Sequence, residues 1–285
     1  MISNIDQRVL FWDSSESAFT DITKAVNNFK EGFAELTFAA NDYLYIGTFL
    51  PFNHRYFNIG APNSTESTAT VEMWNGSTWS SAADILDYTI LNDASFGKSN
   101  ILQFTPNQDY SWALVGDTTE SSNMPEFASG PTIIQKYWMR IGFNVPVEFQ
   151  LKYVGNLFCN ESDLFDEYPA LDSQSILSSW DEGKTSWPDQ RVVASEYVVT
   201  DLKRRNIIIE RSQILDISIF KEPAVNKAAN IIYNGLGVRN YQEEVNASGS
   251  RYTDSMNLNK FETDINGNGQ KDRFEQVVST SWATR

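Results

Sequence analysis

The stretch from Asp42 to Trp79 decides the fold of this chain. It begins Asp42-Tyr-Leu-Tyr-Ile-Gly-Thr-Phe-Leu-Pro-Phe52, continues through Arg55-Tyr-Phe-Asn-Ile59 and ends Thr70-Val-Glu-Met-Trp-Asn-Gly-Ser-Thr-Trp79. Aromatic and β-branched residues recur with a period of two, and Gly, Pro and Asn separate the runs, which predicts antiparallel strands. Asn75-Gly76 favours a hairpin with a two-residue turn, because such a turn needs positive φ at both central residues.

The same alternation extends to both sides of this stretch. Strands are expected at about 33–38, 43–50, 54–60, 68–74, from 78, 84–89, 97–104, 133–143 and 145–154. The remainder of 1–41 is mixed, and the polar stretch 116–130 is predicted to be a long surface loop. Seven to nine short strands with regular turns predict an antiparallel β-sandwich of jelly-roll type.

The pattern changes after Pro169 and becomes helical. Ser186-Trp-Pro-Asp189 predicts a helix start with Ser186 as N-cap, and Lys203-Arg-Arg205 suits its last turn because cations complement the helix dipole. A second helix is expected from Ser212 through Ile219, a third from Ala224 to Tyr233, and a fourth from Asn240 to about Phe261 with Gly249 as a weak point. The predicted class is therefore α+β and multidomain: a β-sandwich domain over residues 1–173, then an α-helical bundle with an extended tail over 174–285.

Net charge follows this predicted division. The chain carries −15 in total, with 8 basic against 22 acidic residues in 1–173 and 14 against 15 in 174–285. An acidic surface repels phosphates and disfavours ordinary nucleic-acid binding. No apolar run approaches the roughly 18 residues of a membrane span, so no membrane association is expected.

The strongest local motif is Asp264-Ile-Asn-Gly-Asn-Gly-Gln-Lys-Asp-Arg-Phe-Glu275, which matches the loop of an EF-hand. Its predicted Ca²⁺ ligands are Asp264, Asn266, Asn268, the backbone carbonyl of Gln270, Asp272 and Glu275. Hard oxygen ligands suit calcium, for which a structural role is expected. The alternative is a polar Asn-Gly turn that binds no ion, since the segment from Gln276 to Trp282 has an extended pattern rather than that of an exiting helix.

Residues for enzymatic chemistry are few, and no enzymatic activity is expected. His54 is the only histidine, and its place on a predicted strand favours a packed side chain over a catalytic one. Cys159 excludes an internal disulfide because it is the only cysteine, and a buried apolar role is expected. Carboxylate pairs such as Asp163 with Asp166-Glu167 could serve a glycosidase, but 37 acidic residues make such pairs unavoidable.

Four aromatic residues lie next to predicted turns. Trp74, Trp79, Tyr110 and Trp112 could form a platform on which sugars stack. The interpretation we favour is that they pack in the core or an interface.

Three segments together resemble structural proteins of tailed bacteriophages. Residues 42–59 with 71–79 resemble a β-sandwich module of phage virion proteins, and residues 187–203 with the following helices resemble head–tail connector (adaptor) proteins. The third segment runs from Tyr241 to Tyr252 and into the Asn/Gly loop at 264–269, and similar tails occur in such connectors.

This resemblance implies a non-enzymatic structural protein, made in the host cytoplasm and resident in the virion. It implies a homo-oligomeric ring in the neck, commonly a dodecamer, that joins the portal protein to the tail and neck proteins, with DNA passing through the lumen without specific binding. A β-sandwich is an addition to minimal connectors. The competing hypothesis is a calcium-dependent carbohydrate-binding component of a fibre or baseplate.

Overall fold

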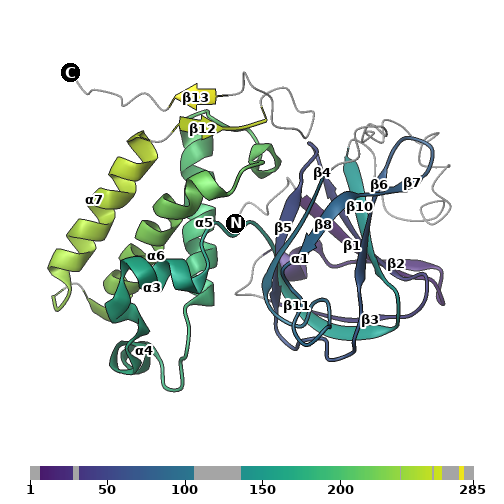
Figure 1. Ribbon diagram of the computed structural model, residues 1–285, viewed down its shortest axis with the longest axis horizontal. Coiled ribbons are helices and arrows are strands. Elements are labelled where there is room, and N and C mark those ends of the chain that lie inside the picture. Colours follow the sequence, from purple (N-terminus) through teal and green to yellow (C-terminus); the bar gives the residue numbers. More distant parts are fainter. Residues whose placement is uncertain are drawn as a thin grey trace. The chain divides into compact units, whose positions relative to one another are not determined.

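The computed structural model describes residues 7–27, 32–105, 136–237, 239–258, 260–264 and 276–278. The chain divides between Gly155 and Asn156 into two compact units, here called the β unit and the helical unit. The β unit holds two antiparallel sheets of six and five strands, and helices dominate the other unit (Figure 1). The predicted α+β class is confirmed.

The six-stranded sheet has the strand order β2-β1-β4-β10-β6-β7. Its strands are β1 (Gln7–Asp13), β2 (Ala18–Asp21), β4 (Tyr43–Thr48), β6 (Ala69–Trp74), β7 (Trp79–Ser81) and β10 (Tyr137–Phe143). The five-stranded sheet has the order β3-β11-β5-β9-β8. It contains β3 (Ala34–Phe38), β5 (His54–Ile59), β8 (Ala83–Asp87), β9 (Asn100–Thr105) and β11 (Val147–Gly155), and the single-turn helix α1 (Thr23–Val26) accompanies the sheets.

One apolar core receives side chains from both sheets. Leu44 and Ile46 of the first sheet and Phe38 and Phe149 of the second belong to it, all buried. Phe38 stacks on Phe149 with ring centroids 5.6 Å apart, across the pairing of β3 with β11. Burial alternates along β3 and along β11 from Val147 to Tyr153, as the period-two pattern predicts, and the alternation ends where Tyr153, Val154 and Gly155 are all buried.

Two features of the β unit differ from the prediction. β1 was not predicted because Val9 packs in the common core while the next residue, Leu10, is buried on the opposite face, so the strand lacks alternation. The hairpin of β6 and β7 is present, but Trp74 pairs with Trp79, so four residues connect the strands instead of two. Only Gly76 takes positive φ there (95°), and the Asn75 side chain accepts hydrogen bonds from the Ser77 and Thr78 backbone N–H groups.

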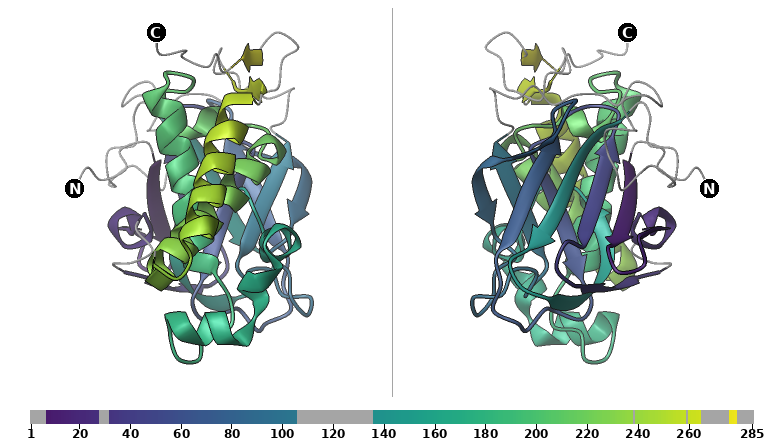
Figure 2. Two further views of the ribbon diagram at one scale, coloured as in Figure 1. Left: turned by 90° about the vertical axis from the view of Figure 1, so that its left-hand side faces the viewer. Right: turned by 90° about the vertical axis from the view of Figure 1, so that its right-hand side faces the viewer.

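The helical unit is built on a second apolar core. Its elements are α3 (Glu161–Glu167), η2 (Pro169–Asp172), α4 (Gln174–Trp180), α5 (Pro188–Arg204), η3 (Arg211–Gln213), η4 (Ser218–Phe220), α6 (Lys221–Gly237) and α7 (Gln242–Leu258). α6 packs against both α5 and α7 (Figures 1 and 2). A two-stranded hairpin follows, formed by β12 (Lys260–Glu262) and β13 (Gln276–Val278). Among the described residues, none of the helices is both long and apolar enough to cross a membrane.

The division between the units falls earlier than the predicted boundary at 173/174. Leu164 of α3 and Leu171 of η2 are fully buried in the helical core together with Leu177 and Trp187, so residues 156–173 fold with the helices. This moves five carboxylates to the helical unit. Residues 1–155 then carry 8 basic against 17 acidic side chains (−9), and residues 156–285 carry 14 against 20 (−6). Both units are acidic, and the predicted contrast between an acidic front half and a neutral back half is wrong.

The expected helix from Ser212 through Ile219 is replaced by two 3₁₀ turns, η3 and η4. In an α-helix the Gln213 carbonyl would accept from the amide four residues later, but here it accepts from the Asp264 amide at 2.8 Å. The Asp216 carboxylate accepts from the Ser218 amide at 2.9 Å, a local turn that competes with helix formation. The other predicted helices are present with shifted ends: Trp187 replaces Ser186 as N-cap of α5, and α7 passes Gly249 without a break.

Candidate functional site

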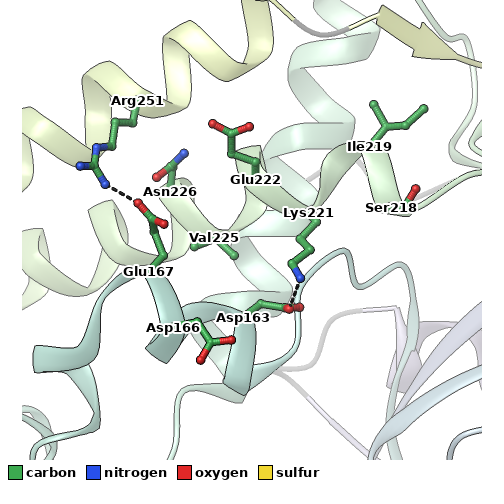
Figure 3. A pocket seen from close by; sticks show the side chains of 10 residues that line it. All are labelled: Asp163, Asp166, Glu167, Ser218, Ile219, Lys221, Glu222, Val225, Asn226 and Arg251. Atoms are coloured by element: carbon green, nitrogen blue, oxygen red, sulfur yellow. Dashed lines mark hydrogen bonds and ion pairs between the residues drawn. The ribbon is translucent and has the colours of Figure 1, made fainter.

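A pocket of about 710 Å³ lies in the helical unit between α3, α6 and α7, with η4 at one end (Figure 3). We call it the α3–α6 pocket. It is lined by Asp163, Asp166, Glu167, Ser218, Ile219, Lys221, Glu222, Val225, Asn226 and Arg251. Its size is within the usual range for small-molecule and side-chain sites, about 300–1,000 Å³.

Local capping fixes the wall that α3 provides. Asn160 is the N-cap: its side chain accepts from the Asp163 amide at 2.8 Å, and the Asp163 carboxylate accepts in return from the Asn160 amide at 2.9 Å. This reciprocal capping box stabilises a short helix whose last turn carries Asp166 and Glu167. Carboxylates near a helix C-terminus interact unfavourably with the helix dipole, so a cation beside Glu167 stabilises the last turn of α3, whereas Asp163 in the first turn is favourably placed.

Two ion pairs join α3 to other helices. Lys221 of α6 pairs with Asp163, and Arg251 of α7 pairs with Glu167 (Figure 3). The Asp163 carboxylate, through its hydrogen bond and its charge, raises the pKa of Lys221 above its usual value. Asp163 and Glu167 are therefore already neutralised within the protein.

Asn226 forms part of the pocket floor, beside Val225. It is 2% exposed, and its Oδ1 accepts from the Tyr168 hydroxyl at 2.7 Å. Burial raises the pKa of Tyr168, and Arg251 nearby opposes this shift, so the phenol stays protonated and donates at neutral pH. The Nδ2 of Asn226 has no acceptor among the described residues, and Figure 3 shows the side chain directed into the space between Arg251 and Glu222.

The remaining carboxylates give the pocket an acidic excess. Four acidic and two basic side chains line it, so its formal charge is −2. Asp166 and Glu222 form no hydrogen bond or ion pair within the part of the chain that the structure describes. The described residues also contain no group of three or more His, Cys, Asp or Glu side chains able to hold a metal ion. The arrangement can bind a cationic group through hydrogen bonds and charge.

Sequence reasoning had named Asp163, Asp166 and Glu167 only as a weak glycosidase signal, and had missed Lys221, Glu222, Asn226 and Arg251. One signal was available for Asn226. It is a lone polar residue on the buried face of α6, among Ala224, Val225, Ala228 and Ala229. A buried amide on an apolar helix face needs polar partners, which directs attention to what lies opposite.

The structure describes only the first residue of the predicted calcium loop. Asp264 is fully buried, its amide donates to the Gln213 carbonyl, and its own carbonyl accepts from Gln213 Nε2 at 2.8 Å. The other expected ligands, Asn266, Asn268, Gln270, Asp272 and Glu275, lie outside the described residues. The loop connects strands β12 and β13, whereas an EF-hand loop connects two helices.

His54 and Cys159 are both buried. His54 lies on β5, 2% exposed, with Nδ1 2.8 Å from the Asn53 side-chain oxygen. Burial raises the pKa of the Cys159 thiol to about 12, so the thiolate needed for nucleophilic chemistry is not formed at neutral pH. The prediction of a packed strand histidine and a buried apolar cysteine is confirmed for their positions.

A second feature is an aromatic cluster on the face of the six-stranded sheet opposite the core. Leu10, Tyr45, Trp74 and Trp138 are buried in it, with Trp12, Phe19, Tyr43 and Trp79 half-buried around them. Gly47 allows this packing, because a Cβ there would lie 2.7 Å from the Trp138 ring. Arg140 lies over the rings of Tyr43 (4.0 Å) and Trp79 (4.6 Å) and pairs with Glu72 at 2.7 Å.

This cluster decides one of the four aromatic predictions. Trp74 is 1% exposed and is a packed residue, as favoured, although its buried Nε1 has no hydrogen-bond acceptor among the described residues. Trp79 is half-buried beside it. Tyr110 and Trp112 lie outside the described residues.

Comparison with known proteins identified no relative of this chain. A scan against protein-family models, a search of curated proteins and a search of solved structures each found no match to this chain.

Proposed function

We propose that this chain is a non-enzymatic structural protein of a tailed-phage virion, forming a ring in the neck that joins the portal to the tail. The observation that carries the assembly role is an exposed apolar patch at one edge of the five-stranded sheet. Leu86, Tyr88, Ile90 and Leu91, here called the β8 patch, are 47, 50, 41 and 47% exposed. Clustered exposed apolar side chains mark protein–protein interfaces.

The opposite edge of the same sheet offers a surface on which the β8 patch of another copy can dock. β8 is the outermost strand at one edge and β3 at the other, and Phe33, just before β3, is 51% exposed. Edge strands present unpaired backbone N–H and C=O groups that another chain can pair with. A β8 patch that docks on the β3 edge of the next copy makes a head-to-tail contact, and repetition of such a contact forms a ring when the rotation between successive copies completes a full turn.

The phage assignment rests on the resemblance of the segments at 42–79, 187–203 and 241–269 to virion and connector proteins. In this proposal the two-sheet β unit is a jelly-roll-like sandwich and the helices are the connector bundle. The ring, commonly of twelve copies in such connectors, contacts portal and tail proteins through the helical unit. Both units are acidic, which favours passage of DNA through the lumen without binding.

The test of this proposal is the oligomeric state of the purified chain with and without the β8 patch. Size-exclusion chromatography with light scattering on wild type and on Leu86→Glu measures it. We expect a closed oligomer for wild type and a shift to monomer for the variant. Ile209→Glu is the matched control, because Ile209 is 82% exposed in the helical unit and distant in sequence from the patch.

A second candidate function is calcium-dependent carbohydrate binding in a fibre or baseplate. The aromatic cluster on the outer face of the six-stranded sheet favours it, since half-buried Trp79, with Arg140 over its ring, offers stacking and hydrogen-bonding groups together. A glycan array tests it. Specific binding that requires Ca²⁺ and is lost in Trp79→Ala supports this function, and an array without a specific signal excludes it.

A further inference from the structure

The described part of the helical unit exposes two large apolar side chains, and both belong to α5 or to the turn that follows it. Tyr197 of α5 is 45% exposed, and Ile209 is 82% exposed. Residues three or four apart share one side of a helix, so Tyr197 lies in a row with Thr200 and Arg204. All three of these residues are exposed. The row therefore presents a mixed apolar and polar surface to solvent.

The chain folds back along α5 and brings Ile209 to the same surface. After α5 the Ile207 amide donates to the Leu202 carbonyl at 3.0 Å, and Arg211 pairs with Glu196 at 3.1 Å. Ile209 comes between these two contacts and so lies beside the C-terminal half of α5. We give the name α5 surface to the following side chains: Tyr197, Thr200, Lys203, Arg204, Ile209 and Lys227.

The turn holds the backbone of Ile209 in a fixed position. Its amide donates to Gln213 Oε1 at 2.6 Å, and Asn206, at the start of the turn, takes the left-handed conformation with a φ of 56°. An apolar side chain on a backbone that is already fixed loses less conformational freedom when a partner covers it. Ile209 is thus suited to contact with another protein.

The α5 surface differs in charge from the protein around it. It contains three cations and no carboxylate, whereas residues 156–285 together carry −6. The two carboxylates beside it are already bonded, Glu196 to Arg211 and Asp201 to the Tyr252 hydroxyl. In a chain of net charge −15 such a surface favours an acidic partner protein, while the acidic remainder disfavours DNA.

Two of the three cations can accept a carboxylate from a partner. The Arg204 side chain is 73% exposed, and its contact with Asp201 is 3.5 Å long. Lys227 lies over the rings of Tyr197 (4.3 Å) and Tyr252 (5.1 Å) and forms no ion pair within the described residues. Burial lowers the pKa of Lys227, and the Asp201 carboxylate opposes this shift. A further carboxylate beside Lys227 would stabilise its charged form.

We propose that the α5 surface binds a segment of a partner protein that combines acidic and apolar side chains. Carboxylates of the segment pair with Arg204 and Lys227, and its apolar side chains pack on Tyr197 and Ile209. This deepens, and rests on, the proposed role of the helical unit in contacts with portal and tail proteins, because it states the chemistry that such a partner must present.

Fluorescence anisotropy of labelled peptides, titrated with the full chain, tests this proposal. The probe is labelled Gly-Asp-Leu-Glu-Leu-Asp-amide, and two further peptides replace either its leucines by glycine or its acidic residues by lysine. We expect binding of the probe, binding of the glycine peptide weaker by about tenfold or more, and no binding of the lysine peptide. Raising NaCl from 50 to 500 mM weakens probe binding, because exposed charge pairs are screened.

Two variants locate the binding site. Arg204→Gln should weaken probe binding about threefold, as for an exposed charge pair. Ile209→Ser should weaken it about tenfold, through lost apolar contact. Arg239→Gln replaces an exposed arginine elsewhere in the same unit and is the matched control, with unchanged affinity.

Three results overturn the proposal: equal binding of the probe and the lysine peptide, an affinity that neither Arg204→Gln nor Ile209→Ser lowers, or displacement of the probe by a short oligodeoxynucleotide. A smaller oligomer in Ile209→Ser than in wild type also overturns it, because the surface would then join copies of the chain.

The outcome is separable from that of the proposed function. Ring formation by a chain that fails to bind the probe rejects the inference about the α5 surface and leaves the assembly role intact. Probe binding by a chain that stays monomeric supports the α5 surface and counts against the ring.

Discussion

Gln213 joins the start of the predicted calcium loop to the helical unit. Its replacement by alanine tests how much this connection stabilises the helical unit. Its side-chain oxygen accepts from the amides of Ile209 at 2.6 Å and Glu210 at 3.1 Å, and its Nε2 donates to the Asp264 carbonyl at 2.8 Å. Gln213 is 6% exposed, so water does not readily replace these bonds.

The expected loss of stability follows from counting the groups that the substitution leaves unsatisfied. The bonds to Glu210 and Asp264 are buried, and a buried donor or acceptor without a partner costs about 1–3 kcal/mol. Ile209 is 82% exposed, so water can hydrate its amide and little is lost there. Gln213→Ala should therefore lower the free energy of unfolding of the helical unit by about 2–6 kcal/mol.

Urea denaturation followed by tryptophan fluorescence measures this loss, since Trp180 and Trp187 belong to the helical unit. Hydrogen exchange at the Asp264 amide gives a local readout, and we expect faster exchange in the variant. Gln174→Ala is the control: among the described residues the Gln174 side chain bonds an exposed Ser178 hydroxyl and nothing else, so a change below about 0.5 kcal/mol is expected. A Gln213→Ala variant as stable as this control, with unchanged exchange at Asp264, would refute the reasoning.

Two further predictions concern pH and calcium. Burial, with Glu244 nearby, raises the pKa of Tyr233 from 10.0 to about 12. Because the pKa is higher in the folded state, the neutral phenol favours folding. This contribution to the free energy of unfolding is fully present below pH 10 and is lost as pH rises toward 12. In denaturation curves measured from pH 10 to 12, the free energy of unfolding of Tyr233→Phe should fall by about 1–2 kcal/mol less than that of wild type. An equal fall in both proteins would contradict the raised pKa of Tyr233. If the loop from Asp264 to Glu275 holds Ca²⁺, calorimetric titration of the full chain gives one site whose affinity falls at least tenfold in Glu275→Gln. A titration without heat favours the alternative of a polar turn.

The strands of the β unit were predictable where one face of a strand meets the core and the other does not. β3 alternates throughout and β11 alternates from Val147 to Tyr153, and both strands were located to within a few residues. β1 was not predicted because the aromatic cluster covers its second face, so Leu10 is as buried as Val9 and the strand shows no alternation. A single sequence does not show which strands have two covered faces, because that depends on residues distant along the chain.

In the helical unit, too, contacts between residues distant along the chain were not predictable from the sequence. Caps and periodicity predicted α5, α6 and α7, but no local signal showed that the Gln213 carbonyl would bond Asp264, 51 residues later, and so end a helix at η3. The α3–α6 pocket was missed for a related reason. Its wall on α3 lies in residues assigned to the other domain, and its ion pairs join Asp163 to Lys221 and Glu167 to Arg251 across long stretches of chain.

The mass of the purified chain in solution tests the proposed assembly most directly. Light scattering on wild type at micromolar concentration should give a multiple of the 32.3 kDa protomer, with Leu86→Glu reduced to the protomer mass and Ile209→Glu unchanged. A wild-type mass of one protomer at every concentration, or a Leu86→Glu oligomer as large as that of wild type, would contradict the account.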